Sequence, residues 1–179
     1  WLEKELPYPV QRVSSGNLRD DQIKKNIASF HPASLPYFTR MNGEKSIGML
    51  MRQCTRAYKI DPITKYIRRE ILGLRPRQQA PKKHVIDIWQ GISYDELTRQ
   101  KVPFVDPWRR NVYPLIERRL TRGHCFEWMA EKGYPKPPRS ACLGCPFHSD
   151  EEWLSIKNGP ADEWEQVIEF DRLIRKTDP

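Results

Sequence analysis

Short apolar and polar blocks alternate along this 179-residue chain and predict small strands and helices in turn. Pro9–Val13 predicts a short strand, and the polar turn Ser14–Asn17 then leads into a helix over about Leu18–Ser29. His84–Trp89 predicts a second strand, because it contains three β-branched residues and an aromatic one. A helix from Ser93 or Tyr94 to about Gln100 follows it. Since strand, turn and helix are the building block of parallel α/β folds, we expect both strands to lie in one parallel sheet covered by helices.

The middle of the chain predicts a loop, a helix and a basic linker. Residues 31–51 contain several Gly and Pro and predict a loop, in which Asn42-Gly43 would close a small hairpin. Asp61 as N-cap and Pro62 at the first helical position predict a helix start. We expect this helix to end at Gly73 and to bury a stripe formed by Ile63, Ile67 and Ile71. A basic linker over Leu74–Lys83 follows.

The C-terminal part of the pattern is mainly helical. Val102–Pro107 predicts an irregular segment and Asn111–Ile116 a short edge strand, because Pro114 cannot donate to a central ladder. Thr121 predicts the cap of a helix to about Lys132, ended by Gly133. Ser149-Asp-Glu-Glu152 is a capping box for a short helix. The last helix covers about residues 161–176, and we expect its buried side to comprise Trp164, Val167, Ile168, Leu173 and Ile174.

Composition narrows the class of protein. Hydrophobic residues make up 38% of the chain and charged residues 30%, with a mean hydropathy of −0.76. No apolar run approaches the roughly 20 residues of a spanning helix, so the composition predicts a cytoplasmic protein and not a membrane protein. The 31 Lys and Arg exceed the 23 Asp and Glu, which gives a net charge of +8. That excess favours nucleotides, phosphates or nucleic acid as partners, although a merely basic surface gives the same charge.

The four cysteines are the main candidates for chemistry. Cys142 and Cys145 form a C-x-x-C pair, while Cys54 and Cys125 stand singly in other segments. Convergence of all four would build a metal or iron–sulfur site; the alternative is two structural thiols and a chance C-x-x-C. His148 is an alternative ligand, although a loop histidine is the simpler interpretation. Structural zinc sites usually have two close pairs, so a single pair favours iron–sulfur over zinc.

Two further groups of residues carry charge. Arg52, Arg56 and Lys59 surround Cys54 and suit phosphate or sulfate, although a solvated basic face has the same pattern. Glu96 and Arg99 share one helix face at a spacing of three, after a strand that ends near Gly91. A surface salt bridge is the simpler interpretation of that pair.

In combination these segments resemble the phosphoadenosine phosphosulfate reductase family of the PP-loop (adenine nucleotide α-hydrolase-like) superfamily. The resemblance covers about residues 9–153 and uses three motifs: Cys54 followed by Lys59 and Pro62, the Gly91–Arg99 segment, and the Ser-Ala-Cys-x-x-Cys-Pro-Phe segment with Cys142 and Cys145. It implies a Rossmann-like, mostly parallel sheet, with a partial nucleotide-binding domain over 1–116 and a helical, C-x-x-C-bearing region over 117–179. It also implies a nucleotide-dependent iron–sulfur enzyme, an oxidoreductase or a sulfur transferase.

The resemblance assigns roles residue by residue. It implies a 4Fe–4S cluster, with zinc as the alternative, held by Cys54, Cys125, Cys142 and Cys145. Lys59 and Arg99 would be catalytic, and these two with Arg52 would line one cleft beside the cluster. The residues implied to bind an adenine nucleotide are Ser14, Ser15, Gly16, Arg52, Gly91 and Glu96.

Two motifs of the family are not found in these residues. We expect its Ser-Gly-Gly-x-Asp-Ser phosphate loop to precede Trp1, so that these residues alone would not bind ATP. Its catalytic cysteine tail is not found either, which leaves sulfur transfer as open as sulfonucleotide reduction. A nucleic acid, tRNA or DNA, is then an open sulfur acceptor. The competing hypothesis is a zinc-stabilised nucleic-acid-binding module. Such a module should have aromatic residues interleaved with basic ones on one element. Five tryptophans occupy core-like or scattered positions instead: Trp89, Trp108, Trp128, Trp153 and Trp164.

Overall fold

A computed structural model describes residues 2–25, 35–41, 44–100, 106–137 and 141–175. The chain divides into two compact units, each taken separately below. Unit 1 combines Trp1–Gly73 with Ala141–Pro179, and unit 2 comprises Leu74–Ser140. The division predicted after residue 116 uses other boundaries and stays a prediction.

Unit 1 begins with two short helices, α1 (Leu2–Glu5) and α2 (Leu18–Lys25). The strand predicted over Pro9–Val13 is wrong: these residues pair with no strand among those described. Pro9 has no N–H to give to a ladder, and Arg12 instead binds Glu3 through two hydrogen bonds of 2.8 and 2.9 Å. Helix α2 starts where predicted, although residues 26–29 of the predicted helix lie outside the described residues.

An antiparallel hairpin occupies part of the segment predicted as loop. Strand β1 (Phe38–Met41) pairs with β2 (Glu44–Met49), with Met41 opposite Glu44. The loop prediction is therefore wrong for these residues. The predicted hairpin is confirmed by its two strands, while Asn42 and Gly43 themselves lie outside the described residues.

A long helix follows the hairpin and begins at Cys54, earlier than predicted. It comprises η1 (Arg56–Ile60), α3 (Asp61–Tyr66) and η2 (Ile67–Ile71), of which η1 and η2 are π-helical. The predicted N-cap role of Asp61 is wrong, because its N–H donates to the carbonyl of Arg56 within the continuing helix. The wider π-turn accommodates Pro62, which lacks an N–H, inside the helix.

The predicted apolar stripe on this helix is only partly correct. Ile67 is buried, but Ile63 and Ile71 are 48% and 55% exposed. Gly73, with a φ of 62°, ends the helix as predicted, because this left-handed conformation strains residues with a side chain.

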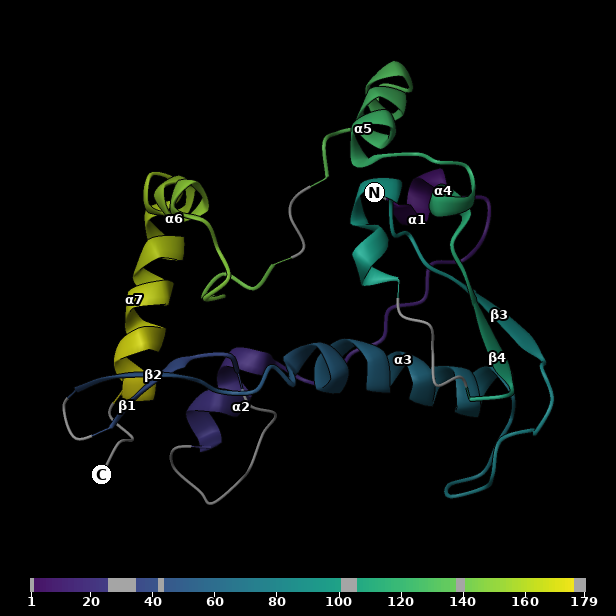
Figure 1. The fold of residues 1–179 in the computed structure, drawn as a ribbon, viewed down its shortest axis with the longest axis horizontal. Coiled ribbons are helices and arrows are strands. Elements are labelled where there is room, and N and C mark those ends of the chain that lie inside the picture. The colour runs from purple at the N-terminus through teal and green to yellow at the C-terminus, as the bar shows by residue number, and fades with distance from the viewer. Residues whose placement is uncertain (1, 26–34, 42–43, 101–105, 138–140, 176–179) are drawn as a thin grey trace. The chain divides into compact units, whose positions relative to one another are not determined.

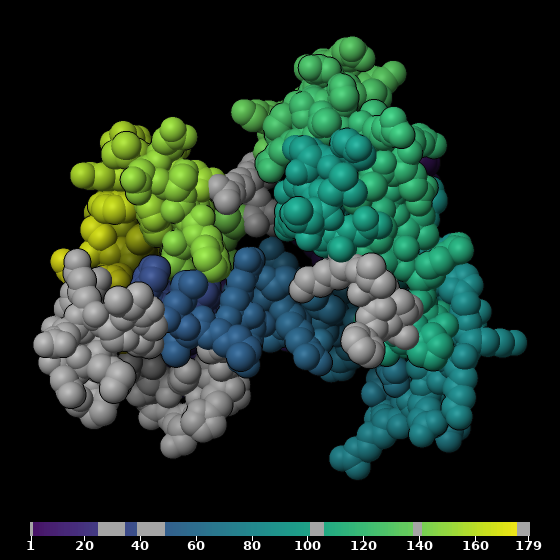
Figure 2. All heavy atoms as spheres, in the orientation of Figure 1, coloured from purple at the N-terminus to yellow at the C-terminus, as the bar shows by residue number. Residues whose placement is uncertain are grey.

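Two packed helices complete unit 1. Helix α6 (Asp150–Lys157) begins at the predicted capping box, in which the Ser149 side chain accepts from the N–H of Glu152 and the Glu152 carboxylate accepts from the N–H of Ser149. Helix α7 (Ala161–Arg175) packs against α6, as Figure 2 shows, and also against α2. The predicted inward residues of α7 are half-buried, and Phe170, three residues after Val167, is its buried residue.

Unit 2 is built on a two-stranded parallel sheet, in which β3 (Ile86–Trp89) pairs with β4 (Arg109–Val112) (Figure 1). The second predicted strand is therefore confirmed from Ile86, but its parallel partner is β4 and not residues 9–13. The edge strand predicted over Asn111–Ile116 starts earlier and ends before Pro114, which begins helix α4 (Pro114–Glu117). Pro114 suits a helix start, because no N–H is needed there.

The other elements of unit 2 follow the sequence closely. The helix predicted near residues 94–100 is η3 (Tyr94–Arg99), a 3₁₀ helix, and α5 (Arg122–Glu131) starts at the predicted Thr121 cap. Residues 74–83 form no helix or strand, as predicted, whereas 102–105 lie outside the described residues. Among the described residues of this unit, Trp108 and Tyr113 form the buried hydrophobic core, and Ser93 is also buried. No described helix is long and apolar enough to cross a membrane.

Candidate metal centre

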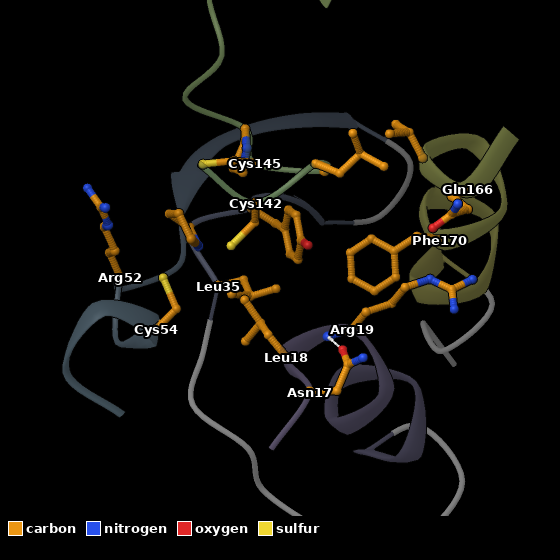
Figure 3. A pocket seen from close by; sticks show the side chains of 16 residues that line it. Asn17, Leu18, Arg19, Leu35, Arg52, Cys54, Cys142, Cys145, Gln166 and Phe170 are labelled. Atoms are coloured by element: carbon orange, nitrogen blue, oxygen red, sulfur yellow. Dashed lines mark hydrogen bonds between the residues drawn. The ribbon is translucent and has the colours of Figure 1, made fainter. Parts of the chain in front are cut away.

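Three of the four cysteines line one cavity of about 230 Å³ in unit 1. Cys54 comes from the start of the long helix, and Cys142 and Cys145 come from the loop before α6. Figure 3 shows their sulfurs on one side of the cavity and Phe170 on the other. Segments almost ninety residues apart in sequence thus meet at one place. This is the part of the predicted cysteine site that the structure brings together.

The C-x-x-C loop is held by its own backbone and by one histidine. The N–H of Cys145 donates to the carbonyl of Cys142 at 3.0 Å, and the N–H of His148 donates to the carbonyl of Cys145 at 3.2 Å. The Nε2–H of His148 donates to the same Cys142 carbonyl at 2.9 Å, while Nδ1 lies 3.5 Å from Glu152. In this arrangement His148, considered above as an alternative ligand, supports the loop through its Nε2.

An aromatic pair supports the loop from the other side. A Cβ at Gly144, between the two cysteines, would lie 3.3 Å from the Phe170 ring, so a side chain there would require the ring to shift by a few tenths of an ångström. The centre of the Phe170 ring lies 6.3 Å from the centre of the Tyr37 ring, and Tyr37 also lines the cavity. Sequence analysis missed all three residues. The 3.6-residue period of α7 could have identified Phe170, but an isolated tyrosine in a predicted loop gave no signal for Tyr37.

The thiols influence one another electrostatically. Partial burial raises the pKa of Cys142, and the neighbouring Cys145 and Cys54 raise it further, because adjacent thiolates repel each other. Lys59 and Arg52 act in the opposite direction and lower the same pKa. Burial, followed by the three thiols, also raises the pKa of Tyr37. The cavity therefore destabilises the Cys142 thiolate unless a positive centre binds it.

Two of the predicted anion-binding residues lie near these sulfurs. Arg52 lines the cavity, and its guanidinium carbon stands 5.2 Å from the centre of the Phe147 ring, which follows the C-x-x-C. Lys59 is exposed on η1, and its positive charge lowers the pKa of Cys142. Arg56, in contrast, pairs with Asp61 at 3.6 Å.

The turn assigned to nucleotide binding has an acidic neighbour. Ser14, Ser15 and Gly16 are exposed in unit 1, and the Ser14 hydroxyl accepts from the N–H of Gly16 at 3.2 Å. A Cβ at Gly16 would lie 3.2 Å from a carboxylate oxygen of Asp21. That same oxygen accepts from the Tyr58 hydroxyl at 2.8 Å, and burial together with this bond raises the pKa of Tyr58 to about 12. The nucleotide role of the turn stays a prediction.

The remaining predicted site residues belong to unit 2. Gly91 is exposed just after β3, and Arg99 binds Glu96 at 2.5 Å, the salt bridge considered above. Cys125 is half-buried in α5. Convergence of Cys125 with the other cysteines, and of Arg99 with Lys59 and Arg52, stays a prediction because these residues belong to separate units.

The donor set fits a soft metal centre. All four cysteines are free thiols. Within the described residues, no three His, Cys, Asp or Glu side chains are grouped closely enough to hold a single metal ion. Thiolates are the ligands of both zinc and iron–sulfur clusters, and three of them already face one cavity. Cys54, Cys142 and Cys145 could therefore hold such a group, with Cys125 as the fourth candidate.

Comparisons with known proteins add no relative: no protein-family model matches the chain, and no curated protein or solved structure is significantly similar to it.

Proposed function

We propose that the chain is part of a nucleotide-dependent iron–sulfur enzyme that acts in sulfonucleotide reduction or sulfur transfer, as in the phosphoadenosine phosphosulfate reductase family. One observation carries the proposal: Cys54, Cys142 and Cys145, from segments far apart in sequence, line a single cavity. Apolar walls, three thiols and two nearby cations are the surroundings that a negatively charged thiolate-bound cluster requires.

The residues around the cavity would have three roles: cluster ligands, charge compensation and support of the loop. Cys54, Cys142 and Cys145 would ligate the cluster, with Cys125 as the expected fourth ligand. The cluster would supply electron transfer or a binding place for sulfur. Arg52 and Lys59 would offset its negative charge and hold a sulfate or phosphate group through charge-assisted hydrogen bonds. His148 would keep the loop rigid through its bond to the Cys142 carbonyl.

The arrangement of the cysteines around a cavity favours an iron–sulfur cluster over a single zinc ion. A cubane with four irons and four sulfides is much larger than one zinc ion, so its ligands need to line a cavity and not to touch. The ligand pattern of one close pair and two single cysteines agrees with this preference. The Rossmann-like sheet remains part of the proposal, and the parallel β3–β4 pair is the element that supports it.

Anaerobic purification followed by a visible absorption spectrum and metal analysis tests the proposal. We expect broad visible absorption, with iron and acid-labile sulfide at about four of each per chain. One zinc per chain without sulfide would contradict the cluster and favour a zinc-stabilised module.

A further inference from the structure

The positive charge of the protein is concentrated in one of its two units. Leu74–Ser140 contains fourteen Lys and Arg against seven Asp and Glu, which gives +7. The rest of the chain has seventeen against sixteen and contributes only +1 of the total of +8. A charge so unevenly distributed produces a local attraction for anions, and not a generally basic protein.

The acidic groups of unit 2 are mostly engaged with nearby donors. Asp87 accepts two hydrogen bonds from Arg110, at 3.0 and 2.8 Å, and Asp106 binds Arg109 at 3.0 Å. Glu96 binds Arg99, and Asp95 accepts from the backbone N–H of Arg122 at 2.9 Å. Three of these carboxylates are each paired with an arginine, so the excess positive charge of the unit is carried by its other Lys and Arg residues.

Three exposed arginines surround one turn, called the arginine turn here: Arg118, Arg119 and Arg122. Arg119 has a φ of 54°, and the other described non-glycine residue with a positive φ is Arg77, at 63°. Glycine or asparagine occupies this left-handed conformation at lower cost, so arginine at both positions points to a use for its charge.

One exposed aromatic residue, Tyr94, is held beside the arginine turn, and a second, Trp89, lies five residues before it in the chain. Trp89 and Tyr94 stand at the two ends of residues 90–93, and their side chains are 74% and 39% exposed. The N–H of Tyr94 donates to the carbonyl of Leu120 at 2.8 Å, which holds this segment beside the arginine turn. Trp89, expected from sequence to be core-like or scattered, is thus an exposed residue at the end of β3, opposite Val112 of β4.

We propose that unit 2 binds single-stranded nucleic acid through this surface. Phosphodiester groups would bind to the arginine turn, and unpaired bases would stack on Trp89 and Tyr94. Exposed rings favour a single strand over a duplex, because the bases of a duplex already stack on one another. This binding goes beyond the proposed enzyme and requires no cysteine, so either proposal can fail without the other.

Fluorescence anisotropy of the full chain with fluorescein-labelled single strands of about 20 nucleotides tests the proposal across a salt series. RNA and DNA form separate arms, since both share the phosphodiester chemistry, and binding of either supports the proposal. The double variant Arg118→Ala with Arg119→Gly should weaken binding about tenfold or more. It should also reduce the slope of log affinity against log salt by about 1.4, because each lost cation contributes about 0.7. The glycine suits the positive φ and preserves the turn.

Two further variants complete the test. Lys4→Ala with Lys65→Ala removes two exposed charges from unit 1 and should leave affinity and slope almost unchanged. Trp89→Ala should lower the affinity about fivefold or more without changing the slope, because stacking releases no counterions. Equal losses from the two double variants would overturn the proposal. So would binding of duplex DNA or phosphatidylserine vesicles as tightly as of single strands.

Discussion

The two units of this chain offer opposite kinds of chemistry. Unit 1 is almost neutral and collects three thiols in an apolar cavity, whereas unit 2 has most of the positive charge and the exposed aromatic residues Trp89 and Tyr94. A soft metal centre needs buried, converging sulfur ligands, while attraction of a polyanion needs exposed cations. The comparison teaches that most of the net charge and three of the four cysteines belong to different units and can be altered separately.

Removal of one buried ring from each unit should give the largest effect on stability. Phe170 and Trp108 are 8% and 2% exposed, and truncation of such a residue costs about 3–5 kcal/mol. Hydrogen exchange should show that Phe170→Ala lowers amide protection in unit 1, and that Trp108→Ala does so in unit 2. Equal loss of protection in both units from either variant would mean that the two unfold as one.

Loss of one of the two cations that act on Cys142 should have a smaller and local effect. Lys59→Ala should weaken sulfate binding by about tenfold or more, because a charge-assisted hydrogen bond contributes about 1.5–3 kcal/mol. Isothermal titration with sulfate would measure this. Lys132→Ala, at the exposed end of α5, is the matched control and should change little. If both variants weakened binding equally, general positive charge and not a site in unit 1 would be responsible.

The smallest predicted effect concerns pH. The raised pKa of Cys142 means that the folded metal-free protein favours the thiol over the thiolate more than the unfolded chain does. This contribution to stability is present below the ordinary pKa of 9.0 and is lost as pH rises through the higher folded value. Solvent screening keeps it below about 1 kcal/mol. Urea denaturation between about pH 8 and 10 should show this decline in the wild type.

The decline with pH should be smaller in Cys142→Ser, which has no titrating thiol at that position. An identical decline in both proteins would show that Cys142 does not contribute.

Local signals in the sequence predicted the ends of elements well. Thr121, Gly133 and the Ser149–Glu152 box act through hydrogen bonds and backbone conformations within a few residues, so the sequence alone was sufficient. Asp61-Pro62 predicted a helix start that the structure does not have. The same dipeptide also fits inside a helix, where a π-turn accommodates the missing N–H of Pro62. Pro9–Val13 failed for a different reason: a strand requires a partner, and pairing is not a local property.

The candidate site was predictable only in part for the same physical reason. Cysteine spacing indicated which residues could ligate, and three of them do line one cavity. The residues that shape the cavity, Tyr37 and Phe170, meet through tertiary contacts between a hairpin and a distant helix. No spacing in the sequence encodes that meeting.

The central claim is that unit 1 contributes ligands to one iron–sulfur centre, and its most direct test is the iron and sulfide content of cysteine variants prepared without oxygen. We predict about four iron and four sulfide per wild-type chain and little of either in Cys54→Ser, Cys142→Ser and Cys145→Ser. Serine preserves the size of the side chain, so that the fold is kept. Full iron and sulfide content in Cys54→Ser, with loss only in the two C-x-x-C variants, would contradict the single centre.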